Sequence, residues 1–365
     1  MMALVVMISF ITFATANPRL LVDMETGEVL FEKEAGMPWY PASLTKLTTA
    51  LVVFNAIEKG SITLETPVGI SSLAARTPGG KSGIAPGRAV KMGDALNLLI
   101  VKSANDIAVA IAQTVSGSVE DFVAEMNRTA RNLGMSATRF ANPHGLNNIN
   151  QVTSARDLAI LTLAIRSEFP QYKELFATSQ VEVNGRILKT RNNLLTDFAG
   201  TDGMKTGYIC AAGMNIVATV ERSGRKLLAI VLGASSERER GEMVGQMISG
   251  YLGGNGSGTG QSVAHIRNVL ELAPVNMRSK LCGNETSSYL GERAREFSFG
   301  LNGNPSFLTD RVPARSYRVN VMARMPSVPR PRPRLVRAAL NSGQGVSLKN
   351  AAMAVIPVPR PRIQR

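Results

Sequence analysis

A serine and a lysine stand one helical turn apart early in the chain, in Ser43-Leu44-Thr45-Lys46. They open an apolar stretch that reads as a helix and ends at Gly60. Residues three apart share one face of a helix, so the Ser43 Oγ and the Lys46 Nζ can meet without help from a loop. A serine hydroxyl becomes a nucleophile beside a base. Lysine is such a base where burial and a neighbouring positive charge lower its pKa from about 10.4 to roughly 7–8.

Two further motifs carry groups that complement this pair. Ser103-Ala104-Asn105 lies where a helical segment over 90–113 is expected to break, and it offers a hydroxyl for proton relay and an amide that donates and accepts. Lys205-Thr206-Gly207 supplies an ammonium group, a hydroxyl for a carboxylate and a glycine that lets a substrate approach the backbone. A Ser-x-x-Lys motif alone is common on helices. The three motifs in this order, separated by 60 and 102 residues, are the signature of penicillin-recognising serine enzymes.

Five segments together resemble the low-molecular-mass penicillin-binding proteins and, more narrowly, the serine-type D-alanyl-D-alanine carboxypeptidases. They are residues 41–46, 103–106, 142–146, 154–157 and 202–207. The resemblance covers residues 19–252 and implies a β-lactamase/transpeptidase-like fold and a periplasmic location, possibly at the periphery of the inner membrane. The resemblance also implies that the substrate is a peptidoglycan stem peptide ending in D-Ala-D-Ala and that β-lactam antibiotics are covalent inhibitors. No metal or organic cofactor is implied.

The resemblance also implies roles for particular residues. Ser43 would be the acylated nucleophile and Lys46 its base. Ser103 would help to shuttle protons, and Asn105 would hold substrate on the opposite wall of the cleft.

On the edge strand, Lys205, Thr206 and Gly207 would bind the terminal carboxylate of the substrate. The backbone N–H groups of Ser43 and Tyr208 would form the oxyanion hole, which is the larger electrostatic contribution in such reactions. Arg240 falls where the family tends to place an arginine near the carboxylate, and Arg191 is a weaker candidate of this kind. Both arginines could equally be surface residues.

Hydrophobic patterning predicts an α+β domain. Two short apolar runs flank a glycine-containing turn at 24–27 and read as a hairpin. The predicted helices span 43–59, 90–113, 119–133 and 155–165, and the predicted late strands span 216–220 and 226–232. We expect the early and late strands to share one antiparallel sheet flanked by the helices.

Positive charge gathers at the end of the chain. The net charge is +14, but residues from 253 onward hold 17 basic and 5 acidic residues, whereas the first 252 hold 24 and 22. This distribution argues against a nucleic-acid partner for the main domain. Residues 253–365 begin with a glycine-rich linker and repeat Val-Pro-Arg-Pro-Arg, so we expect a largely disordered basic tail with one strand at 316–323. The tail either contacts an anionic membrane or cell-wall surface or is solvated without a partner.

The family resemblance does not extend into this tail. Many members end in an amphipathic anchoring helix, whereas the final residues here carry no helical apolar stripe.

The first 16 residues read as a secretory signal peptide. An apolar run over 3–16 ends in Ala-Thr-Ala, a small-x-small cleavage site, and is too short to span a bilayer. Because no Lys or Arg precedes the run, the start of the signal is expected to be truncated; a buried strand is the alternative. The predicted catalytic domain is then 17–252.

Cysteine and histidine are scarce. The two cysteines, Cys210 and Cys282, exclude a disulfide scaffold and a Cys-x-x-Cys zinc site. Cys210 is expected to be a small packed residue rather than a reactive thiol. His144 is expected to be structural and His265 incidental, and the loop over 77–83 is expected to be flexible and close to the cleft.

Three other functions share parts of this pattern. A serine β-lactamase with a Ser-Asp-Asn motif uses a glutamate for deacylation; here Ala104 replaces the aspartate, and no glutamate occurs between Glu125 and Glu168. A catalytically silent murein-binding protein would have no reason to keep all four of Ser43, Lys46, Ser103 and Lys205. An endopeptidase acting on D-alanyl cross-links uses identical chemistry, so the sequence leaves it open.

Overall fold

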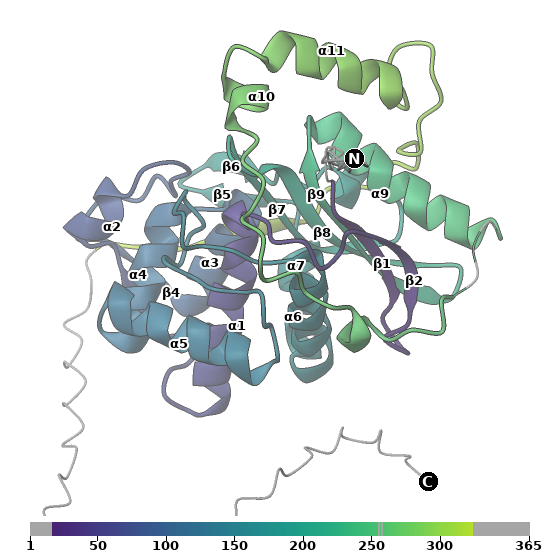
Figure 1. Ribbon diagram of the computed structural model, residues 1–365. Coiled ribbons are helices and arrows are strands. Elements are labelled where there is room, and N and C mark those ends of the chain that lie inside the picture. The colour runs from purple at the N-terminus through teal and green to yellow at the C-terminus, as the bar shows by residue number, and fades with distance from the viewer. Residues whose placement is uncertain (1–16, 255, 257, 324–365) are drawn as a thin grey trace, which may run out of the picture. The chain divides into compact units, whose positions relative to one another are not determined.

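An antiparallel sheet of five strands forms the centre of the protein (Figure 1). The computed structural model describes residues 17–254, 256 and 258–323. The strands are β1 (Arg19–Asp23), β2 (Val29–Lys33), β7 (Thr201–Ile209), β8 (Gly213–Arg222) and β9 (Arg225–Ala234). Their order is β2-β1-β9-β8-β7, and Leu21 of β1 lies opposite Ala229 of β9. This confirms the predicted α+β class with early and late strands in one sheet, and it places β7 at an edge.

Helices fill most of the chain between the hairpin and β7. The α-helices up to that strand are α1 (Thr45–Glu58), α2 (Ser72–Arg76), α3 (Met92–Asn97), α4 (Asn105–Ser116), α5 (Val119–Asn132), α6 (Ala155–Glu168), α7 (Lys173–Ala177) and α8 (Leu194–Asp197). Shorter turns are η1 (Ala42–Leu44), η2 (Leu98–Lys102) and η3 (Pro170–Tyr172). After the sheet, α9 (Glu237–Leu252) completes the predicted domain. None of the described helices is by itself long and apolar enough to cross a membrane; the bent pair of α4 and α5, which meet at 86°, reaches that length only together.

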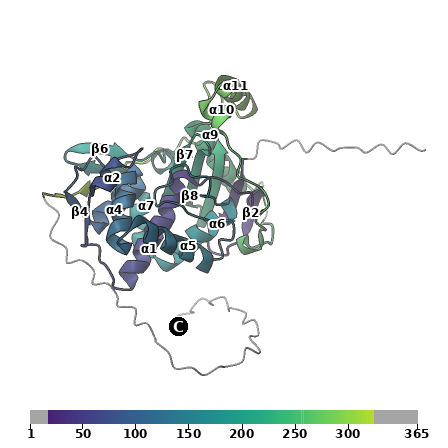
Figure 2. The same cartoon turned by 60° about the vertical axis from the view of Figure 1, so that its left-hand side comes forward.

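The two faces of the sheet bury different cores. Successive side chains of a strand point to opposite faces, so Leu20 and Val22 join a core formed with α1 and α6, whereas Leu21 joins a second core. In that second core Val244 and Ile248 of α9 cover the sheet. The sheet is therefore a middle layer, with α9 on one face and the main helical region on the other (Figures 1 and 2).

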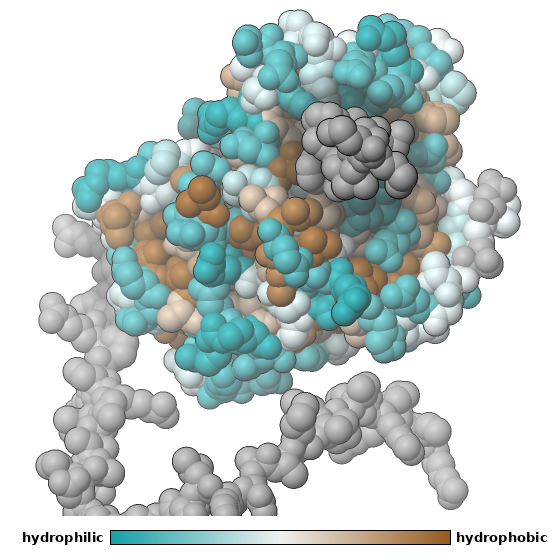
Figure 3. Space-filling model, viewed as in Figure 1, coloured by the Kyte–Doolittle hydropathy of each residue, from teal (hydrophilic) through white to brown (hydrophobic). Residues whose placement is uncertain are grey.

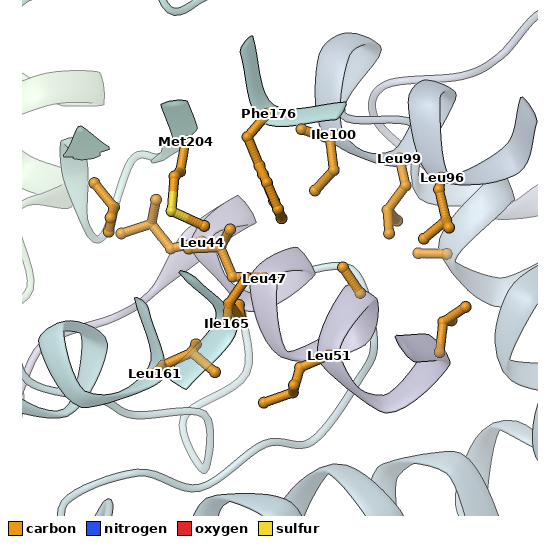
Figure 4. Close-up of a cluster of buried hydrophobic side chains, with 14 of the residues drawn as sticks. Leu44, Leu47, Leu51, Leu96, Leu99, Ile100, Leu161, Ile165, Phe176 and Met204 are labelled. Atoms are coloured by element: carbon orange, nitrogen blue, oxygen red, sulfur yellow. The ribbon is translucent and has the colours of Figure 1, made fainter. Parts of the chain in front are cut away.

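Helix α1 is the centre of the larger core. Leu47 and Leu51 lie on its buried face and Leu44 lies just before it in η1, and Figure 4 shows the three with Leu161 and Ile165 of α6 and side chains from other elements. Those other side chains are Leu96, Leu99, Ile100, Phe176 and Met204. Because helices on several sides contact α1, the turn at its start has a fixed position relative to the sheet.

The predicted break in the second helical segment is present. The π-helical turn η2 ends at Lys102, Ser103 adopts the left-handed conformation with φ 60°, and α4 begins at Asn105. A non-glycine residue in this conformation is uncommon and often marks a functional site. The helical segment starts later than predicted, at Met92, because Ala89–Lys91 form strand β4.

Residues 258–323 differ from the predicted linker and disordered tail, and the predicted boundary at 252 is wrong for this segment. They include η4 (Val263–His265), α10 (Arg278–Cys282), α11 (Thr286–Glu296), β10 (Ser316–Val319) and β11 (Val321–Met322). β10 adds in parallel to the hairpin β5 (Gln180–Val183) and β6 (Arg186–Lys189), and β11 pairs with β4, which also pairs with β3 (Pro67–Gly69). The described residues thus form one compact unit. The predicted strand at 316–323 is observed as β10 and β11.

The two cysteines also depart from the prediction. Cys210, expected to be a packed thiol, forms a disulfide with Cys282 across 72 residues of sequence. The bond ties the end of β7 to α10. The helix α11, at the top of the view in Figure 3, is mostly hydrophilic, and Tyr289 is its buried residue. The sequence of this segment therefore gave little sign of a packed helix. The predicted signal peptide (1–16) and the Pro/Arg-rich residues 324–365 lie outside the described residues.

Candidate active site

Ser43 and Lys46 meet at the start of α1. Ser43 lies in the turn η1, and the fully buried Lys46 lies in the first turn of α1. The Lys46 Nζ donates to the Ser43 Oγ at 3.2 Å, to the Asn105 Oδ1 at 2.7 Å and to the backbone carbonyl of His144. These partners fix the ammonium group beside the hydroxyl, as the helical spacing predicts.

The surroundings of Lys46 favour its neutral form. Burial lowers the pKa of Lys46 well below its ordinary value, and the positive charge of Lys205 lowers it further, while Asp106 opposes this effect. Both causes are those that the sequence argument requires of a lysine base. Lys46 is therefore neutral at lower pH than a solvated lysine, as a base beside Ser43 requires.

Ser103 and Asn105 form the facing wall. Asn105 links Lys46 to the loop over 77–83, because its Nδ2 donates to the Pro78 carbonyl at 2.9 Å and its backbone N–H donates to the Gly80 carbonyl at 2.7 Å. Within the described residues the buried Ser103 Oγ has no hydrogen-bond partner. A buried hydroxyl without a partner costs free energy, so this oxygen is available to a bound molecule or a transferred proton.

Strand β7 forms the third side. Lys205 and Thr206 are buried, and the Lys205 Nζ donates to the Thr206 carbonyl at 2.9 Å. Burial lowers the pKa of Lys205 to about 7, and the charge of Arg240 contributes. Burial likewise lowers the pKa of Arg240 to about 10; its guanidinium donates to the Arg191 carbonyl at 2.7 Å. Arg240, on α9, is thus a buried cation near the site and not a surface residue.

Gly207 allows β7 to approach η1. A Cβ atom at this position would lie 2.9 Å from the Ser43 nitrogen and 3.0 Å from the Pro41 carbonyl oxygen, closer than side-chain carbons come to such atoms. Only glycine fits there. Tyr208, the next residue, lines the same cleft as Ser43, so the two residues predicted to supply the oxyanion donors face one cleft.

These residues surround one cleft of about 440 Å³. The predicted residues that line it are Ser43, Ser103, Asn105, Lys205, Thr206, Gly207, Tyr208 and Arg240. Lys46 lies behind Ser43 and contacts it. All nine predicted site residues are therefore brought together, although they come from η1, α1, the break before α4, the first residue of α4, β7 and α9.

The structure adds groups that the motifs did not name. The His144 carbonyl accepts from Lys46, and Gly79 and Gly80 line the cleft, as expected for a loop close to it. The His144 ring has a structural contact: its Nδ1 accepts from the Leu146 N–H at 3.2 Å. The Asn-Pro-His-Gly motif marks a turn at His144. It does not predict that the His144 carbonyl contacts Lys46, because a backbone carbonyl is present in every residue type.

Arg191 and Glu237 also line the cleft and form an ion pair at 3.2 Å. Arg191, the weaker arginine candidate, is therefore an exposed residue at the rim of the cleft, and its backbone carbonyl accepts a hydrogen bond from Arg240.

Known proteins match more than half of this chain. A family model described as D-alanyl-D-alanine carboxypeptidase matches residues 12–236. The chain belongs to this family. Among relatives, D-alanyl-D-alanine carboxypeptidase DacF of Bacillus subtilis is 32% identical over 238 residues, covering 64% of this chain and 61% of that protein. D-alanyl-D-alanine carboxypeptidase DacC of Escherichia coli is 35% identical over 232 residues, covering 62% and 58%.

Solved structures of related carboxypeptidases and penicillin-binding proteins share the fold. Penicillin-binding protein 5 of Haemophilus influenzae has a TM-score of 0.62 at 32% identity, covering 65% of this chain and 71% of that one. Penicillin-binding protein D2 of Listeria monocytogenes, in its cefotaxime-bound form, has a TM-score of 0.59 at 30% identity, covering 65% and 97%. The transpeptidase-like fold predicted from the motifs is thus confirmed. The chain spans about three fifths of the length of the curated relatives it matches.

Proposed function

We propose that this protein is a serine-type D-alanyl-D-alanine carboxypeptidase that removes the terminal D-alanine from peptidoglycan stem peptides. The observation that carries the proposal is the contact of the buried Lys46 Nζ with the Ser43 Oγ at 3.2 Å, in the cleft that also holds Lys205 and Arg240. A nucleophile with its base and a set of cations for a carboxylate are the groups that cleavage next to a C-terminal carboxylate requires.

The first half of the reaction forms an ester on Ser43. The Ser43 Oγ attacks the carbonyl carbon of the penultimate D-alanine while neutral Lys46 accepts the hydroxyl proton. The backbone N–H groups of Ser43 and Tyr208 stabilise the oxyanion. The C–N bond then breaks, and the leaving D-alanine takes the proton from Lys46, directly or through Ser103. Lys205, Thr206 and Arg240 hold its carboxylate.

The second half consumes a water molecule. Its oxygen bonds to the acyl carbon, the ester C–O bond breaks and a proton returns to the Ser43 Oγ, so the enzyme is regenerated. A β-lactam is an acyl donor of similar shape, and its opened ring stays attached and keeps the cleft occupied. We therefore propose β-lactams as covalent inhibitors; the ampicillin-bound form of Listeria penicillin-binding protein D2 supports this by analogy.

Replacing the nucleophile tests the proposal. We expect purified enzyme to gain the mass of one penicilloyl group with benzylpenicillin and to remove one D-alanine from pentapeptide muropeptides. Ser43→Ala should lose both, with a fall in kcat of about 10⁴-fold or more. Ser167→Ala, an exposed serine elsewhere, is the matched control and should keep both. Penicilloylation of the Ser43→Ala variant would contradict the proposal.

The same muropeptide digest separates the rival reactions. Release of monomers from cross-linked dimers would favour an endopeptidase, and a D-alanyl-D-alanine endopeptidase of Pseudomonas aeruginosa is 31% identical over 220 residues. Rapid turnover of benzylpenicillin would favour a β-lactamase. Labelling and turnover both absent would favour a silent murein-binding protein.

We propose that the protein is exported to the periplasm. The apolar run over 3–16 supports this proposal, and so does the Cys210–Cys282 disulfide, because such bonds persist in oxidising compartments. N-terminal sequencing of protein recovered from a periplasmic fraction should begin at Asn17.

We also propose an anionic membrane or cell-wall surface as the partner of the basic residues from 253 onward, which hold 17 basic and 5 acidic side chains. The full chain should sediment with phosphatidylglycerol vesicles in low salt, and a chain ending at residue 323 should sediment less. Equal sedimentation would point to a solvated tail.

A further inference from the structure

A second cavity of about 410 Å³ lies beside the catalytic cleft. Its lining comes from the loop after α2, from η2 and from the β5–β6 hairpin, namely Lys81, Ser82, Gly83, Lys102, Val183, Asn184, Arg186 and Leu188. We call it the basic cavity. Lys102, the residue before Ser103, lines the catalytic cleft as well. The two cavities therefore adjoin at Lys102.

The charge of the basic cavity is not neutralised within the described part of the chain. Its lining holds Lys81, Lys102 and Arg186 and no acidic residue, and none of the three takes part in an ion pair among the described residues. The Lys81 Nζ donates to the Ala75 carbonyl at 2.7 Å, which leaves its charge unpaired.

Another cavity of the protein shows the opposite arrangement. In a cavity of about 320 Å³, the side chains of Arg166 and Lys173 contact the carboxylate of Asp202, and Lys173 also contacts that of Glu221. The three cations of the basic cavity, which have no ion-pair partner among the described residues, attract an anion of matching size. The cations of the 320 Å³ cavity do not, because carboxylates already neutralise them.

Strand β6 indicates how far this cavity lies from the carboxylate end of the cleft. Arg191, just after β6, lines the cleft, and Arg186, at the start of β6, lines the basic cavity. Strand β6 rises roughly 10 Å from Arg186 to Lys189, and two further residues lead to Arg191. A substrate lying extended beside β6 would cover that length with about three to five residues. The basic cavity is therefore within reach of the same peptide, on the amino-terminal side of its scissile bond.

We infer that the basic cavity binds a carboxylate of the stem peptide on the amino-terminal side of its D-Ala-D-Ala end. This inference rests on the proposed function and adds a specificity subsite to it. Stem peptides carry a glutamate linked through its side chain, which leaves the α-carboxylate free three residues before the terminal D-alanine. Lys102 and Arg186 would contact that carboxylate while Lys205 and Arg240 hold the terminal one.

A pair of peptides that differ in one charge tests the inference. One is L-Ala-γ-D-Glu-L-Lys-D-Ala-D-Ala, and the other carries the amide of the same α-carboxylate. We expect the wild-type enzyme to show a KM about fivefold lower for the acid, the ratio given by one partly exposed charge contact. Arg186→Gln should raise the KM for the acid to that of the amide while kcat and the rate of benzylpenicillin acylation stay unchanged.

Lys189→Gln is the matched control. Lys189 lies on the same strand, three residues after Arg186. Its side chain therefore points to the opposite face of the hairpin, and it does not line the cavity. This variant should keep the fivefold preference. Equal KM values for the two peptides in the wild-type enzyme, or an unchanged preference in Arg186→Gln, would overturn the inference.

Equilibrium binding separates this inference from the proposed function. In Ser43→Ala, calorimetry should give a Kd about fivefold lower for the acid than for the amide, and Arg186→Gln added to that variant should remove the difference. If the wild-type enzyme hydrolyses neither peptide but this difference in Kd persists, the proposed function fails and the subsite stands. If both peptides are hydrolysed and bound alike, the subsite fails and the function stands.

Discussion

Three cationic side chains at the cleft, Lys46, Lys205 and Arg240, are almost completely buried, and burial is the main cause that lowers the pKa of each. Their charges also act in series: that of Arg240 lowers the pKa of Lys205 further, and that of Lys205 lowers the pKa of Lys46 further. The Arg240 guanidinium stays charged, Lys205 titrates near neutrality, and burial together with the charge of Lys205 favours the neutral form of Lys46. A bound carboxylate would raise the pKa of Lys205 and so keep it charged.

This series predicts a bell-shaped pH dependence of kcat/KM. Activity should rise with pH as Lys46 becomes neutral, and it should fall again as Lys205, with its pKa of about 7 in the free enzyme, loses its charge. Lys205→Arg should move the alkaline limb upward by more than two pH units, because a guanidinium stays protonated. Steady-state kinetics from pH 5 to 10 measure the profile, with Lys189→Arg as the control. An alkaline limb that stays in place would show that another group causes it.

His144 predicts a pH dependence of stability. Burial, with help from the charge of Lys46, lowers the pKa of His144 to about 3. Because an unfolded histidine titrates at about 6.5, the unfolded chain binds more protons between pH 3 and 6.5, and the free energy of unfolding falls as the pH falls through that window. His144→Gln should flatten this slope in urea titrations, whereas replacing the exposed His265 in the same way should leave it unchanged.

At the scale of elements, the hydrophobic pattern of the sequence predicted those helices and strands whose formation depends on neighbouring residues. The hairpin at 19–33, the helix after Ser43 and the break at Ser103 all follow from residues close together in the chain. The motifs then indicated which residues meet, because a family signature carries distances that periodicity does not. β10 was predicted as a strand but not as a partner of β5, since 136 residues separate Ser316 from Gln180 and the ladder carries no signature in residue type.

The missed disulfide has a similar cause. Two cysteines 72 residues apart, one of them in a segment with a polar surface, carry no sequence signal for pairing. Their partnership depends on where α10 sits, and α10 is placed by contacts such as the Met277 N–H donating to the Ala211 carbonyl at 3.0 Å.

The disulfide should stabilise the fold measurably. It closes a loop of 72 residues, for which the expected contribution to the free energy of unfolding is about 2–4 kcal/mol. Changing both Cys210 and Cys282 to serine should lower that free energy by this amount in urea unfolding. Wild-type protein in dithiothreitol should match the double variant, and the double variant should not respond to dithiothreitol. A wild-type protein insensitive to the reductant would contradict the pairing.

At the scale of the whole molecule, residues 258–323 fasten separate parts of the domain together. Arg293 of α11 pairs with the fully buried Glu239 of α9, and the Phe307 N–H donates to Glu242 at 2.8 Å. β10 and β11 then extend two small sheets on the helical side. The segment therefore contacts both the α9 face of the central sheet and the region that carries Ser103.

Truncation distinguishes this arrangement from a dispensable tail. A chain ending at Leu252 would remove the cation that pairs with Glu239, and it would expose the edges of β4 and β5. We expect it to be insoluble or unfolded at 25 °C by circular dichroism. A chain ending at Ala323 keeps every described contact and should retain cooperative unfolding and penicillin labelling. A soluble, labelled 252-residue chain would refute this account.

The sheet order has a consequence for biosynthesis. β1 needs β9 as its neighbour, about 200 residues later, and β5 needs β10, later still. A nascent chain consequently cannot complete its native ladders until about 320 residues have left the ribosome. Because these strand pairs form late, the central sheet stays unfolded during most of synthesis. An unfolded chain is the state that a translocation channel accepts.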